Sequence, residues 1–492
     1  MKSLAFLVSL GLALPVFADI DATRLARIDA VVEAAIQKAN CPGAVVVVVH
    51  GDAVVYRKAF GHRQLVPVKE PMTFETVFDL ASLTKPIATG TSISLLIERG
   101  QLKLADPIAK HWPEFAANGK EAVTVEHCLL HTSGLIPDNS IKDYVGTREE
   151  MLARIAALKL NAPLGTRFQY SDVGFIVLGE LVKRIAGNSV DTFAAENVFQ
   201  PLKLSGTGYK PTNGPFAVTG IRDGKVIAGI VHDPRAYALG GVAGHAGLFG
   251  TADDLARYAR MLLNGGELDG VRILAPATVK RFTEPHAVPG GLRSYGWDVD
   301  TSYSAPRGEL FPRTTGFGHT GFTGTSLWID PPTKTAIVIL TNRLHPDEKK
   351  GNVTELRRQI ATIVASAVTK DGERVFTERT TLSKPVLTGT DVLTRDKFAL
   401  LKGKSVGLVT NHTGRASDGT PLIDLLAKAE GVKLVALFSP EHGIRGEKDE
   451  KVGDGKDEKT GLPVYSLYGE RRKPTADQLK GIDMLVYDIQ DI

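Results

Sequence analysis

The chain has 492 residues, of which 43% are hydrophobic and 23% charged, and its formal net charge at pH 7 is +4. This length is enough for two or more domains with a large core, and the composition is that of a globular protein. The small net charge, without a basic stripe of interleaved aromatic residues, argues against a nucleic-acid partner.

Residues 1–18 are typical of a secretory signal peptide. Lys2 is followed by an apolar run from Leu4 to Leu14 and by a small-residue cleavage site at Ala18. The run is too short to span a membrane as a helix, and no cysteine follows the cleavage site. We therefore predict a periplasmic or secreted protein without a membrane anchor once the signal is removed.

Two cysteines, Cys41 and Cys128, lie in apolar stretches of the sequence. An exported protein can form a disulfide, but apolar surroundings favour two buried free thiols over a bridge. The sequence shows no paired Cys or His spacing of the kind that binds zinc, so we expect neither a metal nor another cofactor.

The pattern of residues 19–375 predicts one α+β domain. An amphipathic helix is expected at residues 25–38, followed by a hairpin in which "GAVVVVVH" and "AVVYRKAFG" flank Gly51-Asp52. A second hairpin, "GTSLWID" and "TAIVILTN", lies near the end of this part. Helical patterns lie between the hairpins, at residues 83–99, 174–187 and 252–263. Strands at both ends suggest that the terminal strands share one mixed sheet beside a helical region.

Ser82 and Lys85 stand three residues apart in "FDLASLTKPIATG", where an extended run becomes helical. Positions i and i+3 share one helix face, so Lys85 can reach the Ser82 hydroxyl. Pro86 cannot donate a backbone hydrogen bond, which forces the helix to begin close to Ser82. The pattern fits either a serine nucleophile activated by a desolvated lysine or an ordinary helix cap, and the cap is the commoner case for this motif alone.

Two further motifs add candidates. Tyr170 and Asp172, in "FQYSDVGF", precede an apolar helix, and a tyrosine beside an ammonium can carry protons. His319, Thr320 and Gly321 are predicted to open a strand, whose free edge would offer a backbone N–H to an oxyanion and pair with substrate. His131 and His245 lie in glycine-flanked loops and are interpreted as structural histidines.

In this order the three motifs resemble the serine β-lactamase and penicillin-binding family, most closely the branch of class C β-lactamases, D-aminopeptidases and esterases. The resemblance implies that Ser82 is acylated, that Lys85 and Tyr170 transfer protons, and that Phe322 donates its N–H to the oxyanion. Asp172 stands where the family has Asn, and His319 where many members have Lys. Both changes favour an esterase, amidase or peptidase over a strong β-lactamase.

After a polar, turn-rich stretch at residues 376–384, taken as a linker, the sequence changes character. Three apolar runs alternate with helical patterns, which predicts an α/β domain with a parallel sheet over residues 385–492. "LVTNHTG", "SPEHGIRG" and "YDIQDI" resemble the exo-β-N-acetylmuramidase family, which implies Glu441 as the catalytic acid with His442 beside it. The resemblance breaks off at Ile492, so we expect an incomplete domain without muramidase activity of its own.

Three hypotheses follow from these patterns. The first is a serine hydrolase of cell-wall peptides or of D-amino-acid esters and amides, linked to a glycosidase domain. The second is a general esterase or weak β-lactamase, and the third is a peptidoglycan-binding module without turnover. The intact Ser82, Lys85 and Tyr170 argue against the third hypothesis, and the fusion favours the first. The oligomeric state stays open.

Overall fold

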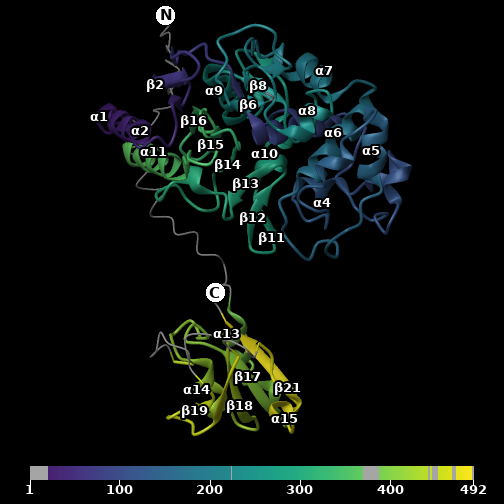
Figure 1. The fold of residues 1–492 in the computed structure, drawn as a ribbon, viewed down its shortest axis with the longest axis vertical. Coiled ribbons are helices and arrows are strands. Elements are labelled where there is room, and N and C mark those ends of the chain that lie inside the picture. Colours follow the sequence, from purple (N-terminus) through teal and green to yellow (C-terminus); the bar gives the residue numbers. More distant parts are fainter. Residues whose placement is uncertain are drawn as a thin grey trace, which may run out of the picture. The chain divides into compact units, whose positions relative to one another are not determined.

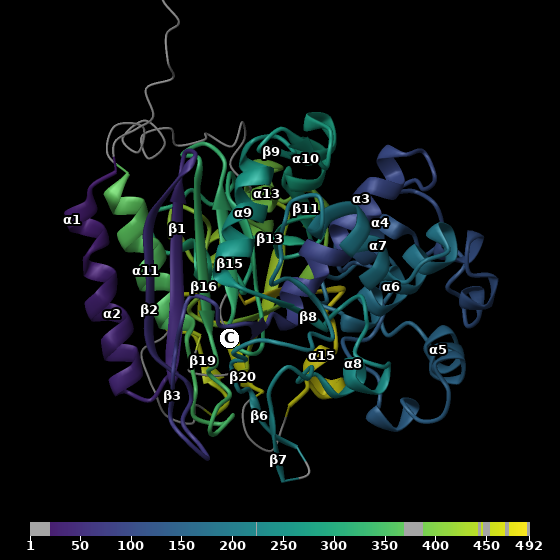
Figure 2. The same ribbon diagram turned by 90° about the horizontal axis from the view of Figure 1, so that it is seen from above.

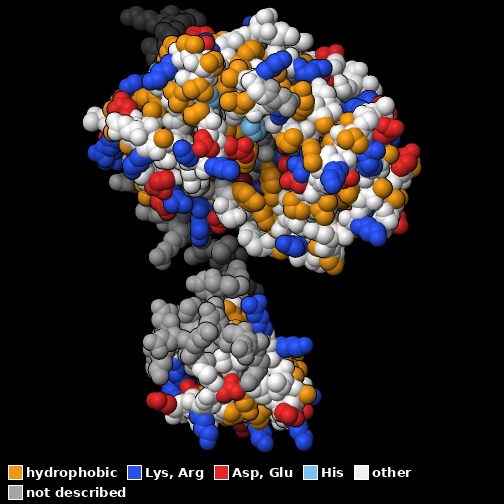
Figure 3. All heavy atoms as spheres, viewed as in Figure 1, with side chains coloured by type: hydrophobic (Ala, Val, Ile, Leu, Met, Phe, Trp, Pro, Cys, Tyr) orange, Lys and Arg blue, Asp and Glu red, His pale blue; other side chains and the backbone are white. Residues whose placement is uncertain are grey.

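The computed structural model describes residues 20–222, 224–368, 387–440, 444–445, 453–467 and 472–489. The chain divides into two compact units, Met1–Glu378 and Arg379–Ile492 (Figure 1). None of the helices in these ranges is long and apolar enough to cross a membrane. The predicted signal peptide and linker lie outside the described residues. On the face drawn in Figure 3, basic and acidic side chains are interspersed, in keeping with the small net charge.

A nine-stranded sheet forms the centre of the N-terminal unit. Its two ends in sequence meet where β1 pairs with β16, which confirms that the terminal strands share one sheet. In the described part of the chain all strand pairs of this sheet are antiparallel, so the sheet is not mixed as predicted. In spatial order the strands are β11 (His286–Val288), β12 (Gly291–Ser294), β13 (Trp297–Asp300), β14 (Phe317–Thr320), β15 (Ser326–Asp330), β16 (Thr335–Thr341), β1 (Gly43–His50), β2 (Ala53–Gln64) and β3 (Glu70–Pro71).

Both faces of this sheet are covered, and strand β1 shows how. Its side chains alternate between two cores: Val45 and Val47 belong to one, whereas Val46 and Val48 belong to the other. Figure 2 shows α1 (Ala22–Leu25), α2 (Arg27–Gln37) and α11 (Thr354–Ala367) on one face. The larger core lies between the other face of the sheet and the helical region.

The helical region contains α3 (Thr91–Glu98), α4 (Val125–Leu129), α5 (Arg148–Ala156), α6 (Asp172–Ala186), α7 (Val190–Ala194), α8 (Pro234–Ala238), α9 (Ala252–Leu263) and α10 (Pro276–Thr283). Short strands accompany these helices: β4 (Phe78–Asp79), β8 (Leu248–Gly250) and β5 (Gly208–Tyr209) form one sheet, and β6 (Gly220–Arg222) with β7 (Lys225–Ile227) and β9 (Glu267–Leu268) with β10 (Val271–Arg272) form two more. The predicted α+β class is confirmed.

The details of the predicted elements mostly hold. Both hairpins form, α9 has the predicted bounds, and Cys41 and Cys128 are buried free thiols. The stretch 83–99 differs, because a 3-10 turn (Ala81–Leu83) and a π-helix (Lys85–Gly90) precede the α-helix there. Such irregular turns are common at functional sites, and hydrophobic periodicity does not reveal them.

The C-terminal unit has a five-stranded sheet in the order β19, β20, β18, β17, β21. Strands β17 (Ser405–Thr410), β18 (Lys433–Ser439), β20 (Pro463–Ser466) and β21 (Met484–Asp488) are parallel, and β19 (Gly455–Lys456) is antiparallel to β20. The described helices are α13 (Gly389–Arg395), α14 (Leu422–Ala427) and α15 (Ala476–Leu479).

The parallel sheet is confirmed, but the sequence predicted only three strands. Strand β20 was missed because it has four residues and begins with a proline, which weakens any strand pattern. Strand β21 lies at the edge of the sheet, with Leu485 45% exposed and Tyr487 68% exposed. An apolar edge of this kind is a place where other chains can pair.

Candidate active site

Ser82 lies on a strained turn that follows β4. Ala81, directly before it, has a φ of +46°, a left-handed conformation that residues with a side chain rarely adopt. The carboxylate of Asp79 accepts hydrogen bonds from the backbone N–H groups of Ala81, at 2.9 Å, and His232, at 2.7 Å. Burial raises the pKa of Asp79 to about 6. These bonds over-determine the local backbone, which is how strain persists at functional sites.

The turn between β14 and β15 is hydrogen-bonded to the Ser82 turn. The hydroxyl of Thr323 donates to the carbonyl of Asp79 at 2.7 Å, and the hydroxyl of Thr325 donates to the carbonyl of Leu80 at 3.1 Å. Both threonines are buried. The sheet therefore fixes the position of the Ser82 backbone through two side-chain bonds.

Gly321 lets the β14–β15 turn approach the Ser82 turn closely. A Cβ at this position would lie 2.6 Å from the carbonyl oxygen of Leu80, so only glycine fits. The guanidinium of Arg357, on α11, donates to the carbonyls of Gly321 at 3.2 Å and Thr325 at 2.8 Å. The following residue, Phe322, lines the same cleft as Ser82, as expected if its N–H belongs to an oxyanion hole.

The prediction that His319-Thr320-Gly321 opens a strand is wrong. Strand β14 ends at Thr320, because Gly321 begins the turn that leads to β15. Nor is β14 at the edge of the sheet, since β13 lies on its other side. That side is paired only between Asp298 and Gly318 in the described part of the chain, which leaves the His319–Thr320 backbone unpaired along the cleft.

Lys85 is fully buried, and its ammonium has three oxygen partners. Its Nζ lies 3.0 Å from Ser82 Oγ, 3.2 Å from the carbonyl oxygen of His245 and 2.5 Å from Asp172 Oδ1. Burial opposes the charge on Lys85, but Asp172 and Tyr170 outweigh it, so the pKa of Lys85 is raised. The resting lysine is therefore an ammonium, hydrogen-bonded to Ser82 and to the His245 carbonyl and ion-paired with Asp172.

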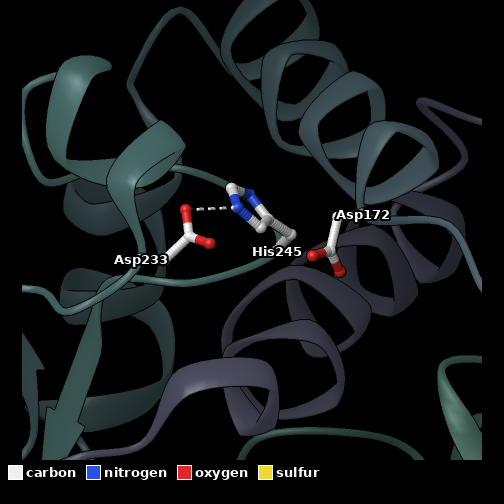
Figure 4. Close-up of side chains that lie close together, drawn as sticks. All are labelled: Asp172, Asp233 and His245. Carbon is white, nitrogen blue, oxygen red and sulfur yellow. Dashed lines mark hydrogen bonds and ion pairs between the residues drawn. The ribbon is translucent and has the colours of Figure 1, made fainter. Parts of the chain in front are cut away.

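Asp172 is also close to a second acid and a histidine. Figure 4 shows His245 between Asp172 and Asp233, with its Nε2 3.0 Å from Asp233 Oδ1. Their donor atoms lie within 4.8 Å of one another, near enough for a metal ion. The Asp172 carboxylate is already paired with the Lys85 ammonium, and the Asp233 carboxylate with the His245 imidazole. The group therefore fits a hydrogen-bonded charge network around Lys85 better than a metal site.

Tyr170 is placed by the start of α6 and by His131. Ser171 caps the helix by accepting from the N–H of Gly174 at 3.1 Å, and its own N–H donates to His131 Nδ1 at 3.0 Å. The His131 ring stacks on Tyr170 with centroids 4.5 Å apart. Burial raises the pKa of Tyr170, and the charge of Lys85, 4.8 Å from the ring centroid, opposes that rise. His131 therefore has a positioning role that its sequence context did not reveal.

His319 is neutral, because burial and the charges of Arg293 and Lys85 hold its pKa well below the ordinary value. Its Nδ1 lies 2.8 Å from the carbonyl of Thr320 and must donate to it, so Nε2 carries the lone pair. No described group bonds to this Nε2. His319 thus presents an acceptor, not a cation, to the cleft.

Ser82 opens into a cleft of about 520 Å³, a size that suits a small peptide; Lys85 and Asp172 are not among the described residues that line it. Ser82, Tyr170, His319, Thr320, Gly321 and Phe322 lie along it. Sequence reasoning missed its cations, which include the buried Arg293 on β12 and Arg357 on α11. A lone arginine within a strand pattern gives no sign of where its side chain will lie.

The C-terminal unit contains the remaining residues that the sequence singled out. Glu441 and His442 follow β18 and lie outside the described residues. His412, in the second His-Thr-Gly of the chain, follows β17 in this unit.

Two family models match the chain. Residues 28–362 match the β-lactamase family, and residues 406–492 match the N-terminal part of the exo-β-N-acetylmuramidase NamZ. Among curated proteins, an N-acetylmuramyl-L-alanine amidase of Bacillus subtilis is 31% identical over 68% of this chain and 85% of its own. A protein of Escherichia coli, named a D-alanyl-D-alanine carboxypeptidase, is 32% identical over 62% of this chain and 79% of its own.

Solved structures agree on the fold. EstCE1, a hydrolase with promiscuous acyltransferase activity, superposes with a TM-score of 0.57 at 25% identity, covering 70% of this chain and 99% of its own. A penicillin-binding protein homologue from Caulobacter crescentus gives 0.56 at 22% identity, covering 71% and 98%. This chain therefore belongs to the β-lactamase family of serine hydrolases and carries, in addition, a NamZ-type N-terminal domain.

Proposed function

We propose that the N-terminal unit is an exported hydrolase that cleaves amide, peptide or ester bonds of cell-wall fragments through an acyl-enzyme on Ser82. The observation that carries this proposal is the 3.0 Å contact between Lys85 Nζ and Ser82 Oγ, beside Tyr170 and at the cleft wall. A hydroxyl next to a lysine–tyrosine pair has a route for its proton, which is what a serine nucleophile needs.

In the proposed reaction, the Tyr170–Lys85 pair first loses one proton to solvent. Ser82 Oγ then attacks the substrate carbonyl and gives its proton to that pair. The N–H groups of Ser82 and Phe322 stabilise the oxyanion. Tyr170 then donates the proton to the leaving nitrogen or oxygen, whose bond to the carbonyl carbon breaks. Water attacks the resulting ester by the reverse proton path, which releases the acid and restores Ser82.

We infer the substrate class from the named relatives and from the second domain of the chain. Named relatives point to N-acetylmuramyl-L-alanine amides and D-alanyl-D-alanine peptides, and the second domain resembles an exo-β-N-acetylmuramidase. Both halves would then meet the same polymer, in the periplasm or outside the cell. Glu441 and His442 stay our candidates for the glycosidase chemistry of the second domain.

Digestion of purified muropeptides, followed by mass spectrometry, tests this function. The full chain should release either the stem peptide from the sugar or a terminal D-alanine, and Ser82→Ala should release neither. Intact muropeptides after incubation with an enzyme whose Ser82 is reactive would reject the cell-wall substrate. Equal digestion by the Ser82→Ala variant would reject the mechanism.

A general esterase is the second candidate. The neutral His319 favours it, because an imidazole grips a substrate carboxylate less firmly than an ammonium does. The likeness to EstCE1 points the same way. Rapid turnover of simple acyl esters, with no turnover of muropeptides, would select this alternative over a cell-wall amidase or peptidase.

A further inference from the structure

We propose that Arg293 is a specificity-determining residue that binds a carboxylate on the leaving group of the substrate. The inference rests on the proposed function, since it assigns a partner to one end of the Ser82 cleft. It starts from an unusual feature: a fully buried guanidinium that forms part of the wall of an open cleft and retains unused donors.

The donors of Arg293 are only partly used. Its Nη1 donates to Asp298 Oδ1 at 3.2 Å, across the β12–β13 pair. Its Nε and Nη2 have no hydrogen-bond partner among the described residues, although both atoms are buried. A buried guanidinium normally satisfies its N–H groups. One edge of the planar fork is therefore free, and that edge matches the two oxygens of a carboxylate.

Asp298 only partly neutralises the charge of the Arg293 guanidinium. Its carboxylate also accepts from Thr301 Oγ1, at 2.5 Å, and from the Ser304 hydroxyl, so its two oxygens are shared among three donors. The guanidinium carbon of Arg293 lies over the Phe168 ring, 5.5 Å from its centroid. This cation–π contact helps to hold the guanidinium in place without using its N–H donors.

The aromatic contacts place Arg293 at the leaving-group end of the cleft. Tyr170, which protonates the leaving atom in the proposed reaction, has its ring centroid 5.3 Å from that of Tyr303. The Tyr303 ring in turn packs edge-on against the Phe168 ring, with centroids 6.5 Å apart, and the Arg293 guanidinium lies over Phe168. A leaving group that departs from Tyr170 therefore moves along the wall to which Arg293 belongs.

His319 cannot take over this role. Its Nδ1–H is used by the Thr320 carbonyl, and its Nε2 lone pair would repel a carboxylate. Many members of the family that this chain resembles have a lysine at this position, so Arg293 supplies a positive charge that His319 does not. The charge of Arg293 is also one reason why the pKa of His319 is well below its ordinary value.

The test uses pairs of substrates that differ only in the leaving group. An N-acyl-D-alanyl-D-alanine is compared with its C-terminal amide, and N-acetylmuramyl-L-alanine with N-acetylmuramyl-L-alaninamide. Release of the amine by the full chain gives kcat/KM for each. We expect the acid of at least one pair to be preferred by roughly tenfold or more, the size of a charge-assisted hydrogen bond. Arg293→Gln should remove that preference, mainly through KM of the acid.

Two further variants serve as controls for this test. Arg293→Lys keeps a charge beside Asp298 but lacks the fork, so it should fold and retain part of the preference. Arg358→Gln, on the exposed side of α11, should leave both rates and their ratio unchanged. Thermal unfolding of each variant is measured alongside.

The outcomes separate the inference from the function on which it rests. Equal rates for acid and amide in the wild type, or an equal fall of both in Arg293→Gln and Arg293→Lys, would show that Arg293 only holds β12 to β13. Failure of the wild type to cleave either pair while Ser82 still reacts with a fluorophosphonate would also overturn the inference. A wild type whose Ser82 does not react would overturn the proposed function itself.

Discussion

At the scale of single residues, Asp172 determines the protonation of the site. Its carboxylate lies 2.5 Å from Lys85 Nζ and is the main reason why the pKa of this buried lysine is raised rather than lowered. A protonated Lys85 cannot accept the Ser82 proton. Activity of the wild type should therefore rise with pH, as the proton is lost from the Lys85–Tyr170 pair.

Replacement of Asp172 by Asn should shift this rise. Without the carboxylate, burial dominates and the pKa of Lys85 falls, so the rising limb of kcat/KM against pH moves to lower pH. In this variant, the rate of acylation by a penicillin should increase more than the rate of ester hydrolysis. Asp138→Asn is the matched control, because Asp138 is close to the same cluster but pairs with Arg235. A limb that stays in place in Asp172→Asn would contradict this role.

Some functional residues could be predicted from the sequence and others could not. Ser82, Lys85, Tyr170 and His319 stand in recognisable motifs, and the structure brings them together. Arg293 stands in no motif, because its importance comes from burial and unused donors that only the tertiary structure creates.

At the scale of elements, the β14–β15 turn holds the Ser82 turn by hydrogen bonds from Thr323 and Thr325. The β15–β16 hairpin was predictable because two β-rich apolar runs flank a turn, and α9 because its apolar residues repeat with a helical period. The irregular turns at residues 81–90 were not, since strain is held by contacts from distant segments. For the same reason the sequence misplaced His319-Thr320-Gly321 at the start of a strand.

Thr325→Val tests this turn-to-turn contact. It removes the bond to the Leu80 carbonyl with little change of shape and should cost about 1 kcal/mol of unfolding free energy. Because the Ser82 backbone loosens, acylation should also slow by roughly tenfold. In Thr335→Val, a buried threonine of the same sheet loses its bond to the Thr333 carbonyl and its contact with His50 Nδ1, so this variant should lose at least as much stability but acylate normally. Equal acylation rates in both variants would refute the contact's role.

At the scale of the whole molecule, the two units differ in how well they are packed. The described core of the N-terminal unit fills both faces of its sheet. The described core of the C-terminal unit is much smaller, and its edge strand β21 leaves Leu485 and Tyr487 exposed. Since stability grows with buried apolar surface, the C-terminal unit should be the less stable one.

Calorimetry should therefore show two transitions, of which the first belongs to the C-terminal unit. All three tryptophans of the chain, Trp112, Trp297 and Trp328, lie in the N-terminal unit. The first transition should accordingly leave the tryptophan emission unchanged, and the second should change it. A single transition, or a first transition that alters tryptophan emission, would contradict this order of unfolding.

The central claim is that Ser82 is the nucleophile, and intact-protein mass spectrometry tests it most directly. After incubation of the full chain with a fluorophosphonate or a penicillin, we predict a single adduct that peptide mapping assigns to Ser82. Ser82→Ala should bind no adduct and should unfold at the same temperature as the wild type. An adduct of equal yield on the folded Ser82→Ala variant would contradict the account.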